Sequence, residues 1–317
     1  MTIPARSVAV ADEASLAAEN GLASMIADAA RLARPRIAVM VLATVATAAW
    51  VTSAGHVDGG ALSWVLAGTL AVAASSSIAN QILERHTDRL MARTSSRPIA
   101  AGRLGVRDAW MATGVLLVVG LAVTYRSGGA VATLASLLTW ALYVLAYTPL
   151  KRLTPLNTAV GAIAGALPVA IGWGAAEGPA RLVAGDVPGA LAVGALATVL
   201  YLWQFPHFMA IAWLYRGQYA DAGLRMLTVV DPGGLRAAGQ ALAAALAMVP
   251  VSLIVAVPSA SVPLFLVSAA ASTAYVAATI RFAVRRDDSS ARGLLLTSLL
   301  SLLSILVAAV ACGGPSA

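Results

Sequence analysis

The chain has 317 residues, of which 60% are hydrophobic and only 11% are charged, and its formal net charge is +7. Soluble proteins carry roughly 25% charged residues, so this composition excludes an ordinary soluble enzyme and indicates a polytopic membrane protein. The excess of positive charge follows from the one-sided placement of Lys and Arg described below, and we therefore infer no nucleic-acid partner. The single cysteine excludes an internal disulfide.

Residues 1–34 include four acidic residues and lack the apolar centre of a secretory signal, so we interpret them as a cytoplasmic N-terminal segment. Residues 35–317 are expected to form one intramembrane domain, because no polar stretch outside the membrane is long enough for a second domain. Within it, nine apolar segments are long enough to cross a hydrocarbon core of about 30 Å. They span roughly 36–53, 61–83, 109–125, 129–147, 156–175, 189–213, 236–257, 262–283 and 293–312.

Basic residues predict the orientation of these helices. Apart from Arg126 and Arg181, every Lys and Arg lies in the N-terminal segment, in the loops after the even-numbered helices or at the helix ends that adjoin them. The positive-inside rule then places the N-terminus and the even loops in the cytoplasm. Nine crossings put the C-terminus on the opposite side. We expect a multi-pass protein of the bacterial cytoplasmic (inner) membrane, whose lipid bilayer is its first partner.

The second apolar segment ends in a ladder of oxygen-bearing side chains, Asn80, Glu84 and Asp88. Their i, i+4, i+8 spacing puts them on one helical face, about 6 Å apart along the axis. Such a ladder suits a divalent metal ion, and Arg93 and Arg97 follow in a loop that can hold a phosphate. The plain alternative is a solvated helix end in the head-group layer. The combination favours an intramembrane diphosphate site.

A second cluster closes the fourth apolar segment, where Tyr147 is followed by Lys151, Arg152 and Asn157. Lys151 is the only lysine of the chain and offers a compact charge, whereas the neighbouring guanidinium is a planar fork. Together they suit the oxygens of a diphosphate. An ordinary topogenic Lys-Arg pair is the alternative interpretation.

A third cluster accompanies the sixth apolar segment. Trp203 and His207 lie one turn apart around Pro206, and Asp221 and Arg225 follow in the next loop. A proline inside a crossing helix is tolerated where neighbouring groups or a cavity satisfy the freed carbonyl. An imidazole there can bind a porphyrin iron or a propionate, or it can be no more than an interfacial anchor.

These clusters resemble the intramembrane UbiA-type prenyltransferase superfamily and, within it, the protoheme IX farnesyltransferase (heme O synthase) family. The match covers about residues 35–310. The motifs that carry it are Asn80-Gln81 with Glu84 and Asp88, Arg93-Thr94, Arg97-Pro98, Gly102-Arg103, Tyr147 to Arg152, Asn157, Gly161 to Trp173, Trp203 to Phe208, Tyr219, Ala222-Gly223 and Met226-Leu227. The element Trp203 to Phe208 separates the heme enzymes from their quinone-making relatives.

The resemblance implies an all-α bundle of nine transmembrane helices around a central cavity. It implies transfer of the farnesyl group from farnesyl diphosphate to a vinyl group of protoheme IX, which gives heme O and diphosphate, with heme A synthase as a further partner. Catalytic roles fall on Asn80, Glu84, Asp88, Lys151 and Arg152, the first three as ligands of Mg²⁺. Substrate-binding roles fall on Arg93, Arg97, Tyr147, Asn157, Trp203, His207, Asp221 and Arg225.

One departure from the family pattern concerns the second acidic motif. The family usually has Asp at the position of Gln218, and an amide is a poorer metal ligand than a carboxylate. Asp221 is the nearest carboxylate in that loop. Two other functions stay open: a UbiA-type prenyltransferase that acts on an aromatic quinone precursor or a chlorin, and a non-enzymatic transporter. Against the transporter, no pair of interrupted helices recurs in matching halves.

Overall fold

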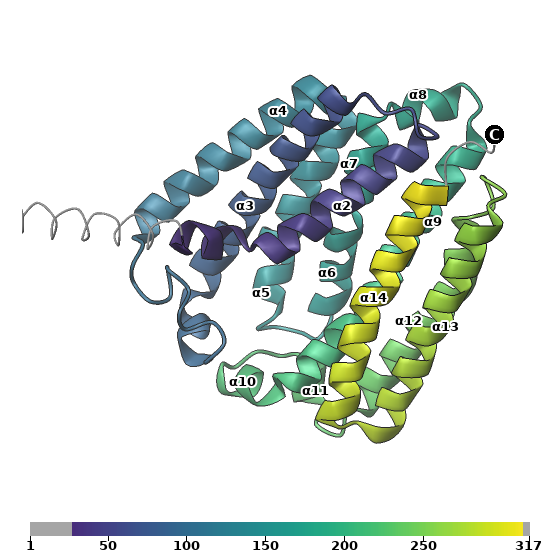
Figure 1. Ribbon diagram of the computed structural model, residues 1–317. Helices are drawn as coiled ribbons and strands as arrows, with labels where there is room; N and C mark the ends of the chain where they lie inside the picture. The colour runs from purple at the N-terminus through teal and green to yellow at the C-terminus, as the bar shows by residue number, and fades with distance from the viewer. Residues whose placement is uncertain (1–26, 313–317) are drawn as a thin grey trace, which may run out of the picture.

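The computed structural model describes residues 27–312, which are built from helices without any strand (Figure 1). Most of the expected N-terminal segment therefore lies outside the described residues, and only its end, helical over 27–33, is seen. The helices that follow are α2 (Pro35–Thr52), α3 (Gly59–Leu90), α4 (Val106–Ala141), the π-helical η1 (Leu142–Tyr147), α5 (Thr148–Leu150), α6 (Asn157–Ala166), α7 (Pro168–Ala175), α8 (Gly178–Val183), α9 (Val187–Leu214), α10 (Arg216–Asp221), α11 (Leu227–Val230), α12 (Leu235–Ile254), α13 (Val262–Arg285) and α14 (Asp288–Cys312).

The helical stretch Val106–Leu150 is 45 residues long, about twice what one crossing requires. Its backbone breaks at Gly129, where φ is 74° and ψ is −172°, values that only glycine adopts freely. The hydrogen bonds of Ser75 in α3 show where the chain runs before and after this break. Its hydroxyl donates to the carbonyl of Thr113, before the break, and accepts from the indole of Trp140, after it. The chain therefore doubles back at Gly129, and both arms lie along α3.

The predicted membrane bundle is confirmed. Eight helical stretches are long and apolar enough to span a membrane, and the one that doubles back supplies two crossings, which makes nine within residues 27–312. Helices α6 and α7 together form one crossing, Asn157–Ala175. The chain is an integral, multi-pass membrane protein.

Small residues allow the first helices to approach closely. A Cβ placed on Gly68 of α3 would lie 2.8 Å from the carbonyl oxygen of Gly120 in α4, and a Cβ on Gly120 would lie 2.8 Å from the carbonyl oxygen of Gly68. Because apolar helices gain little from leaving equally apolar lipid, such backbone contact is a principal source of helix association in membranes. Any side chain at these two positions would push α3 and α4 apart.

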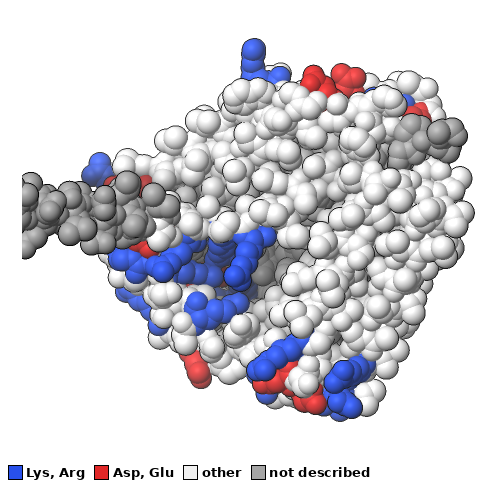
Figure 2. Space-filling view, in the orientation of Figure 1, with Lys and Arg blue, Asp and Glu red and all other residues white. Residues whose placement is uncertain are grey.

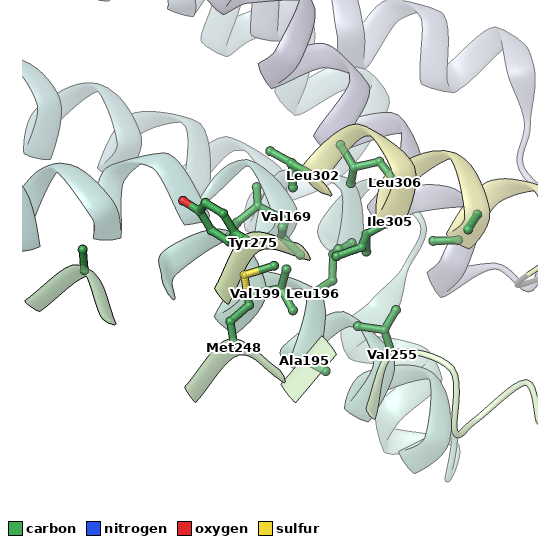
Figure 3. Packing of buried hydrophobic residues seen from close by; sticks show 14 of the residues in the cluster. Val169, Ala195, Leu196, Val199, Met248, Val255, Tyr275, Leu302, Ile305 and Leu306 are labelled. Carbon is green, nitrogen blue, oxygen red and sulfur yellow. The ribbon is translucent and has the colours of Figure 1, made fainter. Parts of the chain in front are cut away.

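Helix α9 lies at the centre of the largest buried cluster. Figure 3 shows Leu196 and Val199 of α9 facing Met248 of α12, Tyr275 of α13 and Ile305 of α14. All five side chains are fully buried. The core of this half of the bundle is therefore a large apolar cluster, and the charged ladder belongs to the other half.

The π-helical turn η1 interrupts the helix just before the second predicted cluster. Pro149 has no N–H to donate to a carbonyl one turn earlier. The hydroxyl of Thr148, the residue before it, donates to the carbonyl of Tyr143, at 2.8 Å. π-Helical turns are rare in proteins, and many of those that occur lie at functional sites. Here the turn brings Tyr143, Tyr147 and Lys151 to the end of α3 that carries the ladder.

Candidate functional site

The ladder of α3 points into the protein. Asn80 and Asp88 are fully buried, and Glu84 is 8% exposed. Burying two carboxylates in a membrane protein is costly unless cations or metal ions face them. The alternative of a solvated helix end therefore does not describe these side chains.

Asn80 is held by hydrogen bonds that fix the orientation of its amide. Its Nδ2 donates to Oγ1 of Thr148, at 3.0 Å, and Thr148 accepts because its own hydrogen is donated to Tyr143. The amide oxygen therefore lies on the other side, where it accepts from Nη2 of Arg34, at 2.8 Å. Nη1 of Arg34 donates to the Tyr143 hydroxyl, at 3.1 Å.

Each carboxylate of the ladder has a cation from a different loop. Nζ of Lys151 lies 2.7 Å from Oε1 of Glu84. Nη1 of Arg97 lies 2.7 and 2.8 Å from the two oxygens of Asp88, and 4.0 Å from Oε2 of Glu84. Figure 2 shows Lys and Arg side chains gathered at the edge of a hollow, near the ends of α3 and α5 of Figure 1. The arrangement is an ordered set of paired charges beside an opening.

The pKa values of two of these cations are shifted in opposite directions. Burial opposes the charge of Lys151, but Glu84 outweighs it and raises the pKa of the lysine above its ordinary value. Burial, and then the nearby charge of Arg34, lower the pKa of Arg97, against the effect of Asp88. Both side chains are charged at neutral pH.

The donor set fits a hard divalent cation but not a soft one. Within residues 27–312, no three His, Cys, Asp or Glu side chains form a group that could hold a metal ion. The ladder instead offers two carboxylates and one amide oxygen, which are ligands that Mg²⁺ accepts, usually with water and substrate phosphates completing its shell. Asn80, Glu84 and Asp88 would hold the ion.

Tyr147 lies directly beside this set. Nζ of Lys151 is 4.4 Å from the centre of its ring, and the ring of Tyr143 is 5.4 Å away. On the other side is Gly161 of α6, where a Cβ would come within 2.8 Å of the Tyr147 ring. The glycine thus makes the room that Tyr147 occupies.

Asn157 connects the loop after α5 with the loop after α10. It is fully buried at the start of α6, and its Nδ2 donates to the carbonyls of Thr154 and Arg225. The backbone N–H of Arg225 in turn donates to the carbonyl of Lys151, at 2.7 Å. The loop after α10 is therefore fastened to the lysine by its backbone, and the Arg225 side chain is exposed.

Arg93 pairs with aromatic residues rather than with the ladder. Its guanidinium lies 4.5 Å from the ring centre of Tyr215 and donates to the Tyr219 hydroxyl, at 3.0 Å. Its backbone N–H donates to Oε1 of Gln218, at 3.3 Å. Gln218 of α10 thus joins that helix to the loop after α3.

The structure does not bring every predicted residue to the ladder. Arg152 and Asp221 are exposed, and within the described part of the chain neither makes a hydrogen bond or an ion pair with the ladder. The predicted pair of Lys151 and Arg152 is thus divided, because the chain turns after α5 and only the lysine points inward.

Trp203 and His207 belong to a separate network on α9, α13 and α14. Their rings stack with centres 4.5 Å apart. Nδ1 of His207 lies 2.7 Å from Oγ of Ser298, whose own hydrogen is donated to the carbonyl of Leu295. Ser298 must therefore accept, so Nδ1 carries the hydrogen and Nε2 of the neutral ring keeps its lone pair. Trp203 also donates to the carbonyl of Ser298, at 2.7 Å.

Sequence reasoning missed three members of the site. Arg34 was counted only as a topogenic charge, Thr148 was part of a motif without a role, and Tyr143 was not considered. For Tyr143, its place one turn before Tyr147 was an available signal. For Arg34, 46 residues from its partner Asn80, the sequence offered none.

Comparisons with known proteins place the chain in a family of membrane enzymes. Residues 41–312 match the model of the UbiA prenyltransferase family. A curated protein of Rhodopirellula baltica, named protoheme IX farnesyltransferase, is 38% identical over 284 residues, which are 87% of this chain and 96% of that protein. Another of the same name, from Solibacter usitatus, is 36% identical over 87% of this chain and 94% of its own length. A UbiA homolog from Archaeoglobus fulgidus, solved bound to GPP and Mg²⁺, superposes with a TM-score of 0.60 at 19% identity, over 90% of this chain and 99% of that one.

Proposed function

Because the chain belongs to the UbiA prenyltransferase family, we propose that it transfers the farnesyl group of farnesyl diphosphate to a vinyl group of protoheme IX. The products are heme O and diphosphate. The acceptor is suggested by relatives named protoheme IX farnesyltransferase that align over nearly their whole length. The prenyltransferase family match also leaves the transporter hypothesis without support.

The observation that carries the proposal is the charge-paired ladder. Two buried carboxylates and an amide oxygen face three basic side chains from separate segments, Arg34, Arg97 and Lys151. A site that binds a carboxylate or a neutral ligand does not need both carboxylates and basic side chains. A diphosphate held through a divalent cation needs both: oxygens for the cation and basic groups for the phosphate oxygens.

In the proposed reaction the allylic C–O bond of farnesyl diphosphate breaks, and the electron pair leaves with diphosphate. When bound at the ladder, Mg²⁺ neutralises part of the diphosphate charge. Lys151 and Arg97 then stabilise the charge that develops on the leaving group. The hydrogen-bonded positions of these side chains before the reaction reduce the cost of orienting them.

The farnesyl cation is attacked by the heme vinyl group, and water adds to the resulting cation with loss of a proton. This gives the hydroxyethylfarnesyl substituent of heme O. The Tyr147 ring, beside Lys151, is proposed to stabilise this carbocation through its π electrons. His207, with the lone pair of Nε2 available, and the stacked Trp203 are proposed contacts of the porphyrin.

The remaining assignments complete the proposal. Mg²⁺ is the proposed metal, as in the relative solved with GPP and Mg²⁺. Arg93, Arg152, Arg225, Asn157 and Asp221 stay proposed members of the substrate site or its loops. The protein is proposed to lie in the cytoplasmic membrane of a bacterium with its ladder toward the cytoplasm, as one catalytic domain over 35–317, and to pass its product to heme A synthase.

The test is incubation of membranes containing the protein with farnesyl diphosphate, Mg²⁺ and protoheme, followed by mass analysis. We expect farnesylated heme and released diphosphate, and much less of both after addition of a chelator of divalent ions. A parallel incubation offers 4-hydroxybenzoate in place of protoheme. Prenylated 4-hydroxybenzoate without farnesylated heme would replace the proposed acceptor by a quinone precursor.

A further inference from the structure

Arg34 occupies a conformation that the sequence around it disfavours. Its φ of 49° and ψ of 66° are left-handed, which is uncommon for any residue other than glycine, and Pro35 follows it. The residue separates the helical turns at 27–33 from α2, so the chain changes direction at this point. Backbone strain of this kind persists only where surrounding contacts enforce it, and it is concentrated at functional sites.

The contacts that enforce it come from the ladder helix α3 and from η1. Nε2 of Gln81 donates to the carbonyl of Leu32, at 3.2 Å, and the Arg34 guanidinium bonds to Asn80 and Tyr143. The backbone just before Arg34 and the Arg34 side chain are thus both held by hydrogen bonds. The outcome is a guanidinium placed on the amide oxygen that the proposed Mg²⁺ would need.

The Arg34 guanidinium reaches the ladder through its direct hydrogen bond to Asn80, one helical turn before Glu84 and two turns before Asp88. A merely topogenic arginine would extend into the head-group layer. Arg36, two residues later, is exposed in that manner.

The charges of the site balance only when Arg34 is counted. Three cations, Arg34, Arg97 and Lys151, face two carboxylates, Glu84 and Asp88, which leaves one positive charge in excess. A prenyl diphosphate carries about three negative charges near neutral pH. One divalent cation together with that excess charge balances them, whereas without Arg34 one negative charge would remain.

We propose that Arg34 is a substrate-binding residue for the diphosphate, and that its charge does the work for which a second metal ion would otherwise be required. The inference rests on the proposed function, because it assumes a prenyl diphosphate at the ladder. It also accounts for Gln218, which bonds to the backbone of Arg93 and contributes no charge.

The experiment measures the affinity of the purified protein for farnesyl thiolodiphosphate in the presence of Mg²⁺, without protoheme. This probe keeps the diphosphate but transfers its farnesyl group slowly. We expect Arg34→Gln to raise its dissociation constant about 10- to 100-fold, the loss typical of a hydrogen-bonded charge contact. Arg34→Lys should raise it less, because it retains the charge without the forked geometry.

Two controls separate binding from structure. Arg36→Gln removes the same charge from an exposed neighbour and should leave the dissociation constant within about twofold. Farnesol has the same chain without the diphosphate, so its binding should be equal in wild type and Arg34→Gln. Equal loss of both probes in Arg34→Gln would mean a structural role and would overturn the proposal, as would unchanged affinity for the thiolodiphosphate.

If Arg34→Gln does not fold, Arg34→Lys decides by the same comparison of the two probes. The proposed function can fail separately. Wild type that binds the thiolodiphosphate but yields no farnesylated heme would refute the acceptor and leave the role of Arg34 intact. Wild type that does not bind the thiolodiphosphate at all would refute the role of Arg34.

Discussion

Individual charged residues in this protein are arranged so that no carboxylate of the site is buried alone. Asp88 is paired with Arg97 through both oxygens, and Glu84 with Lys151. A charged group at the bilayer centre costs roughly 2.5 to 3.5 kcal/mol even on the lowest scales, so these pairs are retained for a purpose that neutral residues cannot serve. Their purpose, in the proposed reaction, is to hold a cation and a polyanion side by side.

Asp88→Asn tests the ladder at this scale. The substitution removes one charge from the proposed metal ligands but keeps an oxygen that Arg97 can bond. We expect the rate of product formation to fall about 10- to 100-fold, as when a metal site loses a supporting group. The measurement is the rate of farnesylated heme formation at increasing Mg²⁺ concentration.

Asp108→Asn is the matched control, because Asp108 is an exposed carboxylate in the first turn of α4. It should retain wild-type activity. Full activity of Asp88→Asn at low Mg²⁺ would show that the ladder does not hold the metal. A melting temperature close to wild type would exclude misfolding as the cause of a lower rate.

At the scale of elements, three segments meet at the ladder: the end of α3, the π-helical turn η1 with α5, and the turn before α2. The second and third of these carry a local irregularity, since Pro149 follows the π-helical turn and Arg34 is left-handed. Regular helices would present side chains at fixed intervals of about 100°. The irregular turns instead direct Tyr143, Tyr147 and Lys151 toward one point.

Gly161→Ala tests the fit between α6 and this turn. Alanine favours a helix over glycine by about 1 kcal/mol, so the helix itself is not weakened. The new Cβ would, however, come within 2.8 Å of the Tyr147 ring and displace it from Lys151. We expect slower product formation with little change in the dissociation constant of farnesyl thiolodiphosphate.

Gly239→Ala in α12 is the control for that substitution, because a Cβ there would have nothing within 4 Å. It should be as active as wild type and no less stable. Wild-type turnover in Gly161→Ala would mean that the position of Tyr147 has no part in the reaction.

For the whole molecule, the two halves of the bundle have different tasks. The helices around α9, α12, α13 and α14 form the large apolar cluster, whereas the paired charges lie at the end of α3 and in the loops beside it. Nine crossings leave α2 starting and α14 ending at opposite ends of the bundle. Because the number of crossings is odd, a label at the C-terminal end of α14 reports on which side of the membrane the start of α2 lies.

Cys312 is the single cysteine of the chain, and it is partly exposed at the end of α14. If the loops with most of the Lys and Arg face the cytoplasm, its thiol faces the other side. A membrane-impermeant maleimide should therefore label it in intact spheroplasts. Cys312→Ser should abolish the label. Labelling only after the membrane is opened would reverse the orientation.

Much of the architecture was readable from local sequence. Each of the nine apolar segments proved to be a crossing, including the two separated by the turn at Gly129, because the need to satisfy backbone groups in lipid leaves a long apolar segment few choices other than a helix. The ladder was readable for a related reason: the spacing of Asn80, Glu84 and Asp88 puts them on one face in any α-helix.

The sequence by itself thus determined the membrane class, the helices and the shared helical face of Asn80, Glu84 and Asp88, since these depend on residues a few positions apart. Only the tertiary structure decided which cations face the ladder. Lys151 does, Arg152 does not, and Arg34 reaches Asn80 from a separate segment. The physical reason is that ion pairing depends on where distant segments pack and how irregular turns aim their side chains. Neither is encoded in the spacing of residues along one helix.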